Sequence, residues 1–540
     1  MVIAFAQTAA AAAQVTAAVD VVVYGSTPAG CAAAIAAARN NASVTLLSVT
    51  QHIGGMMSGG LSCVDAVSRS VVGGIAKEYM DHALAHYYPY EKISHPYCFD
   101  TAEPHVLRTT FDEMLSAAGV HVVLDTPLQG VESQRNQTIS AVVAGGARYT
   151  ASVFLDASYE GDLLAAANVT YTVGREANTA YGEPHAGRRP LQNPSCYAFP
   201  PVDQPVSPYN SSNGALLPLV TSHARDLAPE GSADAAVTAY NYRVCLTNAS
   251  TGRVEIGRPP AYDPAQYELV RRLMRAAPPA SIHQVLKLYA VANVSDGFKV
   301  DVNNVGPLST DLTGGSWAYP EASPLERGAI AATHERYIRG LLWFLRSDDS
   351  VPAAVRRQME SYAWCADEFA SSGHFPPQLY VREARRMVGA VVMTETSVAA
   401  ELGDASIAMG SYSFDCHPTQ VVAIDEGQGG ATTTIEGCIG AGPKRPYQVP
   451  FGAITPRRAE CTNLLVPVAL SASHVAFSSV RIELTWMAVG HSAGVAASMA
   501  AATRGSHSHN ASAAVQDVNL AELHARLVAE GQVLSLGRAS

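Results

Sequence analysis

A strand, a glycine turn and a helix near the start of the chain limit the fold more than any other feature. Residues 20–24 form a short apolar run of the kind that becomes a buried parallel strand. Gly25 and Gly30 follow, and small apolar residues continue to Arg39, which predicts a helix with a narrow side-chain envelope. A second apolar run at 44–47 completes a βαβ unit.

This turn has the character of a phosphate-binding site. A helix N-terminus offers free N–H groups and a positive dipole end, and glycine lets the backbone approach a pyrophosphate closely. Because Thr27 stands where the usual motif has its middle glycine, an ordinary glycine turn is the alternative. The residues of the predicted phosphate turn are Gly25, Ser26, Thr27, Pro28, Ala29 and Gly30.

The end of the second predicted strand departs from a standard NAD site. An acidic residue usually stands there to bind a ribose, and this chain has Ser48. A serine hydroxyl still bonds a ribose hydroxyl but lacks the charged acceptor. This position therefore tells against an NAD enzyme.

Two Gly-Gly doublets follow within residues 52–61. Gly54 and Gly55 precede Met56, and a second doublet closes the segment, so the backbone can pass near a flat ring system or a phosphate. A surface glycine loop is the alternative. Further on, residues 155–163 pass from a strand end through a small-residue turn at Asp156 and Ala157 into a helix, and such a turn is expected to close over the phosphate turn.

Taken together, these segments resemble FAD-dependent oxidoreductases with a glutathione-reductase-type flavin domain. The resemblance covers residues 20–176 and 301–501, with family-like runs at 27–30, 52–56, 159–163, 173–176, 380–386 and 471–474. It implies an α/β fold, in which a Rossmann-type FAD-binding domain carries an inserted mixed α+β substrate domain. It also implies that the phosphate turn, Gly54, Gly55, Met56, Asp156 and Ala157 line FAD. Ser48 replaces the glutamate usual in the family.

The C-terminal part of the resemblance adds a second helix. The run 472–483, which includes Arg481, leads into a helix of small residues. An N-terminus near Met487 to Gly490 would place a positive dipole beside the N1–C2=O edge of the flavin, where charge develops on reduction. Arg481 and Gly490 are therefore further cofactor candidates.

Changes in composition along the chain predict the domain organisation. We expect a leader or degenerate signal segment at 1–18, and the first part of the FAD-binding domain at 19–168. A substrate or cap domain is expected at 169–436, because proline and tyrosine become frequent there. The FAD-binding domain then resumes at 437–505, and 506–540 is expected to be a tail.

The catalytic candidates are His417, His474 and Arg386. Asp415 and His417 are two residues apart, so in an extended segment both point to one face, where an aspartate makes a histidine a better base. Arg386, with Arg382 and Arg385, is a candidate to hold an acidic substrate. A satisfied buried polar group or ion pair is the alternative for each of them.

Three functions remain open at this stage. The first is an FAD enzyme that takes a hydride from a small organic molecule, sugar-like or otherwise hydroxylated. The second is an NAD(P)-linked dehydrogenase, and the third is a non-catalytic carbohydrate-binding protein that retains a flavin fold. The net charge of -11 and the absence of a basic stripe exclude a nucleic-acid partner. No segment predicts a stable membrane span, and the sequence does not indicate an oligomeric state.

Glycosylation sequons favour the secretory pathway over the alternative, the cytoplasm. The chain has N-x-S/T triplets at Asn41, Asn136, Asn168, Asn210, Asn248, Asn293 and Asn510. Chance placement predicts about two, although Ser/Thr-rich loops also create sequons by accident. The nine cysteines form no C-x-x-C pair, so no metal site is expected, and at most four disulfides are compatible with an odd number.

Overall fold

A five-stranded parallel sheet lies at the centre of the larger lobe in the computed structural model of the protein. The strands are β2 (Val19–Tyr24), β3 (Val44–Leu47), β6 (His121–Val123), β10 (Ala151–Asp156) and β25 (Leu464–Leu465). They lie in the order β6-β3-β2-β10-β25, and every neighbouring pair is parallel. This is the 3-2-1-4-5 strand order of a Rossmann fold. The predicted fold class, an α/β fold with a Rossmann-type nucleotide domain, is confirmed.

The structure describes residues 14–65, 67–87, 98–134, 137–191, 205–294, 296–304, 309–399, 401–425, 430–443, 445–506 and 514–536. The sequons at Asn136 and Asn510 lie outside these ranges, as do residues 1–13 of the predicted leader.

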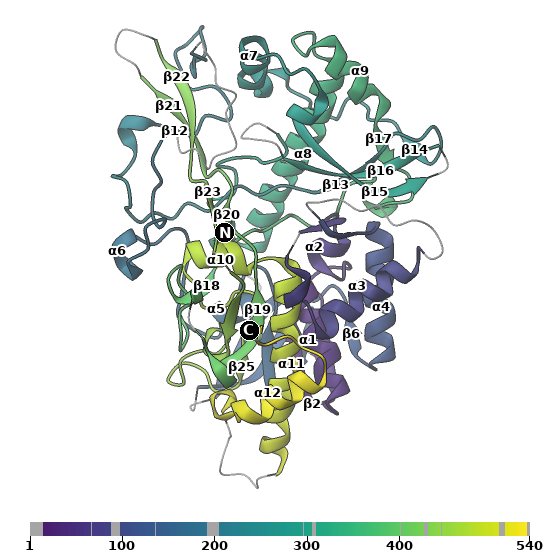
Figure 1. The fold of residues 1–540 in the computed structure, drawn as a ribbon, viewed down its shortest axis with the longest axis vertical. Coiled ribbons are helices and arrows are strands. Elements are labelled where there is room, and N and C mark those ends of the chain that lie inside the picture. Colours follow the sequence, from purple (N-terminus) through teal and green to yellow (C-terminus); the bar gives the residue numbers. More distant parts are fainter. Residues whose placement is uncertain are drawn as a thin grey trace, which may run out of the picture.

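Two helices from opposite ends of the chain pack against each other beside this sheet. They are α1 (Pro28–Arg39) and α11 (Glu483–Ser506), drawn in purple and yellow (Figure 1). Their approach depends on small residues. A Cβ at Gly490 would lie 2.2 Å from the carbonyl oxygen of Ala29, and one at Gly494 would lie 2.2 Å from that of Ala33. The C-terminal part of the chain thus returns to the first βαβ unit.

Further helices and a mixed sheet complete the larger lobe. The helices are α2 (Gly55–Ser58), α3 (Gly74–Ala85), α4 (Pro104–Ala117), α5 (Asp162–Ala166), α10 (His474–Val480) and α12 (Leu520–Ala529). The sheet β1-β9-β8-β7 contains β1 (Gln14–Val15), β9 (Ala147–Tyr149), β8 (Thr138–Ala144) and β7 (Leu128–Gln134). In this sheet only β1 and β9 pair in parallel. Residues 14–15 of the predicted leader therefore pair within the fold. The predicted tail contains α12, whose Leu523 and Leu527 are buried.

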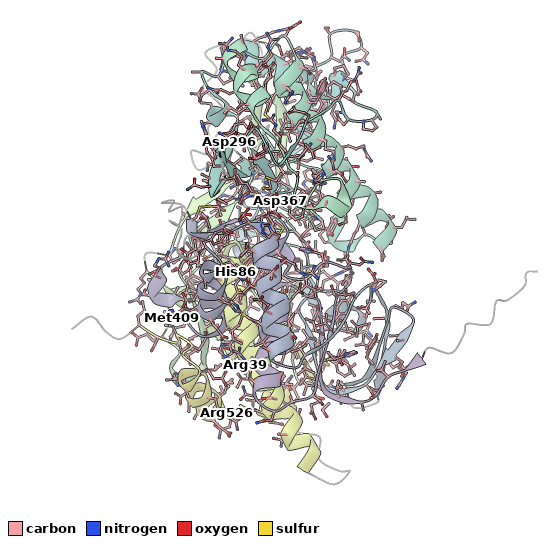
Figure 2. The ribbon with its side chains drawn as sticks, turned by 90° about the vertical axis from the view of Figure 1, so that its right-hand side faces the viewer. Arg39, His86, Asp296, Asp367, Met409 and Arg526 are labelled. Carbon is pink, nitrogen blue, oxygen red and sulfur yellow. A yellow bond between two sulfur atoms is a disulfide. The ribbon has the colours of Figure 1, made fainter. Side chains whose placement is uncertain are left out.

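The smaller lobe consists of an antiparallel sheet with helices. Its strand order is β14-β17-β13-β16-β15, with β13 (Val244–Thr247), β14 (Arg253–Val254), β15 (Leu286–Val294), β16 (Gly297–Asn304) and β17 (Ala363–Cys365). The helices α7 (Glu268–Ala276), α8 (Pro324–Ser347) and α9 (Ala353–Ser361) belong to it (Figure 1). In the rotated view, Asp296 and Asp367 lie in this lobe, whereas Arg39 and Arg526 lie in the larger one (Figure 2).

Short strand pairs complete the fold. They comprise β4 (Cys63–Asp65) with β5 (Cys98–Thr101), β11 (Tyr171–Thr172) with β18 (Arg386–Met387), β19 (Ser406–Gly410) with β24 (Tyr447–Pro450) and β20 (Phe414–Cys416) with β23 (Ile439–Ala441). A three-stranded sheet contains β12 (Ser222–His223), β21 (Gln420–Ile424) and β22 (Thr432–Glu436). The domain limit predicted between residues 436 and 437 separates β19 from its partner β24 and β20 from its partner β23. The domain limits stay predictions.

The structure also bears on a membrane span. None of the helices in the described ranges combines the length and the apolar character needed to cross a bilayer.

Candidate functional site

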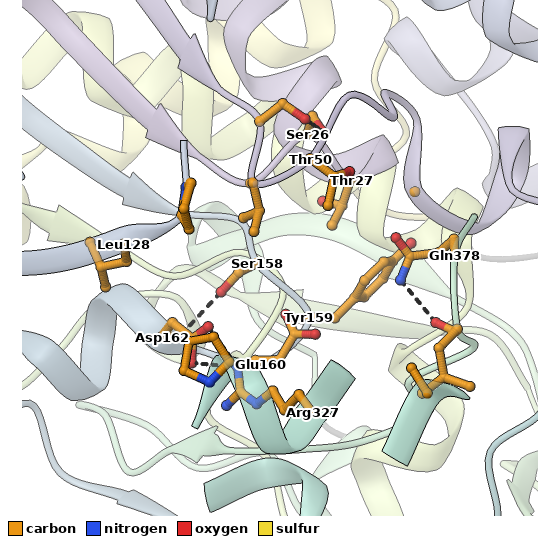
Figure 3. A pocket seen from close by; sticks show the side chains of 18 of the residues that line it. Ser26, Thr27, Thr50, Leu128, Ser158, Tyr159, Glu160, Asp162, Arg327 and Gln378 are labelled. Carbon is orange, nitrogen blue, oxygen red and sulfur yellow. Dashed lines mark hydrogen bonds and ion pairs between the residues drawn. The ribbon is translucent and has the colours of Figure 1, made fainter. Parts of the chain in front are cut away.

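A large cavity opens along the carboxyl ends of the parallel strands. Its volume is about 550 Å³, within the usual range of ligand pockets. Ser26 and Thr27 face Glu160, Asp162 and Arg327 across it (Figure 3). We call it the nucleotide cavity, because it lies where Rossmann folds bind dinucleotides.

The predicted phosphate turn has the geometry that its glycines suggested. Gly25 has a φ of +100°, and a Cβ there would lie 2.6 Å from the carbonyl carbon of Ala157. A Cβ at Gly30 would lie 2.0 Å from the Gly25 carbonyl oxygen. Thr27 caps α1, since its Oγ1 accepts from the Gly30 N–H at 3.2 Å and donates to the Ala157 carbonyl at 2.8 Å. Pro28, Ala29 and Gly30 are buried in the first turn, while Gly25, Ser26 and Thr27 line the cavity.

Ser48 lies at the predicted position beside this turn. Its Oγ lies 2.7 Å from the Oγ of Ser26 and donates to the His52 carbonyl at 2.9 Å. Ser48 also lines the nucleotide cavity. A neutral hydroxyl pair therefore stands where related folds place a carboxylate.

The double-glycine segment forms one wall of the cavity. Gly54 has a φ of +92° and precedes α2, and Gly55 lines the cavity. The Met56 N–H donates to the hydroxyl of Tyr159 at 2.9 Å, and that hydroxyl donates to Glu483 Oε1 at 2.6 Å. The Tyr159 hydroxyl thus links the double-glycine segment to the N-terminus of α11.

That N-terminus carries buried polar atoms without partners in the described structure. They are Glu483 Oε2, Thr485 Oγ1 and the indole nitrogen of Trp486. Burial raises the pKa of Glu483 to about 8, which favours its neutral, donating form. Such orphaned groups beside a helix N-terminus suit a ring with carbonyl and imide edges, and the glycine cradle suits a pyrophosphate, so the residues present fit FAD. The helix begins at Glu483 rather than near Met487, and Gly490 faces α1.

Asp156 and Ala157 hold the phosphate turn from behind. Asp156 Oδ1 accepts from Ser158, and its Oδ2 accepts from the Leu164 N–H at 2.8 Å. Burial raises the pKa of Asp156 to about 6. The Ala157 N–H donates to the Tyr24 carbonyl at 2.7 Å. Ser158, the next residue, lines the cavity, so a direct contact of Asp156 or Ala157 with a cofactor stays a prediction.

A second cavity is lined by residues of both lobes, from β4, β15, β16 and β20 to the residue that follows α10. It measures about 250 Å³, and its lining is mostly polar and charged. We call it the charged cavity. It is lined by Cys63, Asp65, Arg243, Lys287, Tyr289, Asn303, Tyr380, Arg382, Tyr412, Ser413, Asp415, His417 and Arg481.

His417 is the only histidine among the residues that line this cavity. Its Nδ1 lies 2.7 Å from Asp311 Oδ2, and its Nε2 lies 3.5 Å from Asp415 Oδ2. Burial opposes ionisation of Asp415, but His417, Arg481 and Arg382 together hold its pKa well below the usual range. Burial likewise opposes ionisation of Asp311, and Arg382 and His417 lower its pKa. Both carboxylates therefore remain charged beside the imidazole.

Consecutive residues connect the two cavities. Tyr242 and Leu379 line the nucleotide cavity, and the residues that follow them, Arg243 and Tyr380, line the charged cavity. The double-glycine segment runs from one to the other, since a Cβ at Gly60 would lie 1.9 Å from the Arg243 carbonyl oxygen. These residues and the double-glycine segment thus form a shared wall between the two cavities.

The other catalytic candidates lie away from both cavities. His474 is buried, with its Nδ1 2.7 Å from Glu383 Oε2 and its Nε2 3.4 Å from the sulfur of Cys416. Burial lowers the pKa of His474, but Cys416 and Glu383 raise it well above its usual value. Arg386 donates to Glu176 at 2.6 Å and to the Gly174 carbonyl at 2.6 Å. Neither residue lines the charged cavity beside His417, so their catalytic roles stay predictions.

Several site residues are not apparent from the sequence. Asp311 has no motif around it, and only the fold brings it to His417 from 106 residues away. Asp65, Arg243 and Lys287 also come from separate elements. Arg481 was expected at the cofactor, but it lines the charged cavity, where its contact with FAD stays a prediction.

Comparisons with solved structures give short partial matches. A THI4 protein of Thermovibrio ammonificans is 18% identical over 29% of this chain and 66% of its own, with a TM-score of 0.24. L-proline dehydrogenase of P. horikoshii is 14% identical over 29% of this chain and 58% of its own, with a TM-score of 0.23. Thioredoxin reductase of T. acidophilum is 15% identical over 26% of this chain and 34% of its own, with a TM-score of 0.17. The chain thus spans less than two thirds of the length of each.

A match over nearly the whole chain comes from a protein family. A search of curated proteins gave no match. The family described as FAD dependent oxidoreductase matches residues 20–527, a range that contains both lobes and both cavities. This agrees with the strand order, the phosphate turn and the orphaned groups at α11, and it supports an enzyme over a non-catalytic protein and FAD over NAD(P). The protein belongs to the FAD-dependent oxidoreductases, and its cofactor is FAD.

Proposed function

We propose that this enzyme oxidises a hydroxyl group of a small organic substrate held in the charged cavity. The observation that carries the proposal is the position of His417, which lines the cavity while buried Asp311 engages its Nδ1 at 2.7 Å. FAD supplies the chemistry of hydride acceptance when it is bound in the nucleotide cavity. The remaining work, which is to bind, orient and deprotonate the substrate, falls to residues of this chain.

His417 suits the role of general base. A hydrogen bond from Nδ1–H to the carboxylate of Asp311 fixes the tautomer that leaves the lone pair on Nε2. In that tautomer Nε2 of His417 can take the hydroxyl proton as the substrate loses its hydride. Asp415, 3.5 Å from Nε2, is placed to bond the protonated ring afterwards.

The wall between the cavities supports the same assignment. Tyr380 lies in this wall, and its hydroxyl accepts from Arg481 at 3.1 Å. A substrate in the charged cavity would lie on one side of this wall and the nucleotide on the other. The double-glycine segment, which lacks side chains at four positions, is the part of the wall where the two can approach each other.

The test is anaerobic stopped-flow reduction of the bound flavin, with a substrate found by screening hydroxylated compounds. We expect His417→Ala to slow reduction about 10²–10⁴-fold, the usual effect of losing a general base. FAD content should stay the same, because His417 does not line the nucleotide cavity.

His283→Ala is the matched control, since His283 is exposed in the smaller lobe. It should reduce at the wild-type rate. An unchanged rate in His417→Ala would remove His417 from the mechanism.

A further inference from the structure

The charged cavity has more basic than acidic side chains in its lining. The basic ones are Arg243, Lys287, Arg382 and Arg481, and the acidic ones are Asp65 and Asp415. Two further carboxylates, which do not line the cavity, pair with arginines of its lining. Asp301 binds Arg243 at 2.8 and 2.6 Å, and Asp311 lies 3.0 Å from Arg382. The side chains that line the cavity therefore carry more positive than negative charge.

Two of these arginines have donors that the protein leaves unused. The Nε atoms of Arg382 and Arg481 are buried without a hydrogen-bond partner in the described structure, and the two residues are 0% and 2% exposed. The terminal nitrogens of Arg481 are engaged, by Tyr380 at 3.1 Å and by Asp415 at 3.0 and 3.1 Å. A buried N–H of a charged group without an acceptor is costly, and a bound acceptor removes that cost.

The two acidic residues of the lining, Asp65 and Asp415, offset only part of its positive charge. Asp415 is already paired with Arg481 and lies near His417. Burial raises the pKa of Asp65, while Arg243 and Arg481 act in the opposite direction. Tyr380 lies near both arginines, with the guanidinium carbons of Arg382 and Arg481 at 4.8 and 5.8 Å from its ring centre. Both guanidinium groups therefore gather around one side chain in the wall.

We infer that the charged cavity binds a small hydroxylated carboxylate, a hydroxy acid or a sugar acid, whose carboxylate is received by Arg382 and Arg481. The volume of about 250 Å³ limits the ligand to a small molecule. The hydroxyl part of the inference rests on the proposed function, and the carboxylate part rests on the arginines alone.

The reaction on such a substrate balances with the family's cofactor as oxidant. At the hydroxyl-bearing carbon, the C–H and O–H bonds break and a C=O bond forms. The hydride carries both electrons to FAD, and the proton goes to Nε2 of His417. The product is an oxo acid, whose carboxylate keeps its place at the arginines.

The experiment compares acids with neutral partners of the same carbon skeleton, using the full-length protein loaded with FAD. The probes are sodium lactate with 1,2-propanediol and sodium D-gluconate with sorbitol. Binding is measured by the change in the flavin absorption spectrum and by thermal shift, and turnover by anaerobic bleaching of the flavin. We expect the acids to bind and the neutral partners to bind at least about 10-fold more weakly.

Three variants locate the effect. Arg481→Gln should weaken acid binding about 10- to 100-fold, and it should weaken the binding of the neutral partners much less. Arg481→Lys keeps the charge but lacks Nε, and it serves where the glutamine variant fails to fold. Arg336→Gln removes a positive charge from an exposed position on α8 and should bind acids as the wild type does.

The outcomes separate this inference from the proposed function. Acids that bind without bleaching the flavin would support the carboxylate site and contradict hydroxyl oxidation. Neutral polyols that bleach the flavin while the acids fail to bind would support hydroxyl oxidation and overturn the carboxylate site. Equal binding of acids and neutral partners, or no binding of either acid, would also overturn it.

Discussion

Burial and neighbouring charges together set the protonation states of single acidic residues in this protein. Glu483, at the start of α11, illustrates this, because its environment raises its pKa to about 8 through burial. Asp415 shows the opposite result, since nearby His417 and arginines keep it ionised despite its burial. Burial alone therefore does not determine the protonation state, and the nearest charged partner decides it.

We predict that Glu483 makes stability fall with rising pH. Its folded pKa lies above its unfolded value of about 4.3, so its contribution is complete below that value and is lost as pH rises toward 8. Between about pH 5.5 and 8.5 this loss is on the order of 3 kcal/mol. Denaturant unfolding at the two pH values measures it. Glu483→Gln keeps an acceptor for Tyr159, and its free energy of unfolding should fall by that much less than the wild type's between the two pH values. Equal losses of stability in both proteins would contradict the assigned pKa.

Close backbone contacts position the elements around the nucleotide cavity. The phosphate turn, α1 and α11 meet through glycines whose missing side chains leave room only for carbonyl oxygens, as at Gly30 and Gly490. The small residues of the sequence predict these close contacts, but they do not show which glycine lines a cavity and which packs against a helix. Gly25 lines the nucleotide cavity, whereas Gly490 faces a helix.

Gly30→Val should abolish FAD binding. A Cβ at this position would lie 2.0 Å from the Gly25 carbonyl oxygen, so the turn that holds the pyrophosphate must move. The flavin absorbance of the purified variant measures bound FAD. Gly257→Val is the matched control, because a Cβ there meets nothing within 4 Å, and it should retain full flavin content. A folded Gly30→Val protein with normal flavin content would show that the phosphate turn is misassigned.

At the scale of the whole molecule, the disulfides and the sequons are the features that bear on the compartment in which the protein folds. A disulfide joins Cys63 to Cys98 in the wall of the charged cavity, and Cys438 is disulfide-bonded as well. The sequon asparagines in the described ranges are all accessible to some degree. Asn41, Asn168 and Asn293 are exposed, and Asn210 and Asn248 are half-buried. Disulfides persist mainly in secreted and lumenal proteins, and sequons become glycans there.

On these grounds we propose that the protein is secreted or lumenal and carries N-linked glycans. Protein produced through a eukaryotic secretory pathway should lose mass when its N-glycans are removed enzymatically. Asn41→Gln should lower that loss by one glycan, and Asn40→Gln, a change at the preceding residue, leaves the sequon intact and should not. Secreted protein with no mass change would contradict the proposal.

The sequence by itself determined the parts of this protein that depend on neighbouring residues. The βαβ unit, the phosphate turn and the small-residue helices follow from hydrophobic periodicity and from the freedom of glycine, which act over a few residues to a few tens of residues. Only the tertiary structure decided which charged side chains share a cavity. His417 meets Asp311 across 106 residues, and Arg481 meets Tyr380 across 101. Such pairs form because a buried charge needs a partner, and the packing of the two lobes, rather than any local pattern, selects that partner.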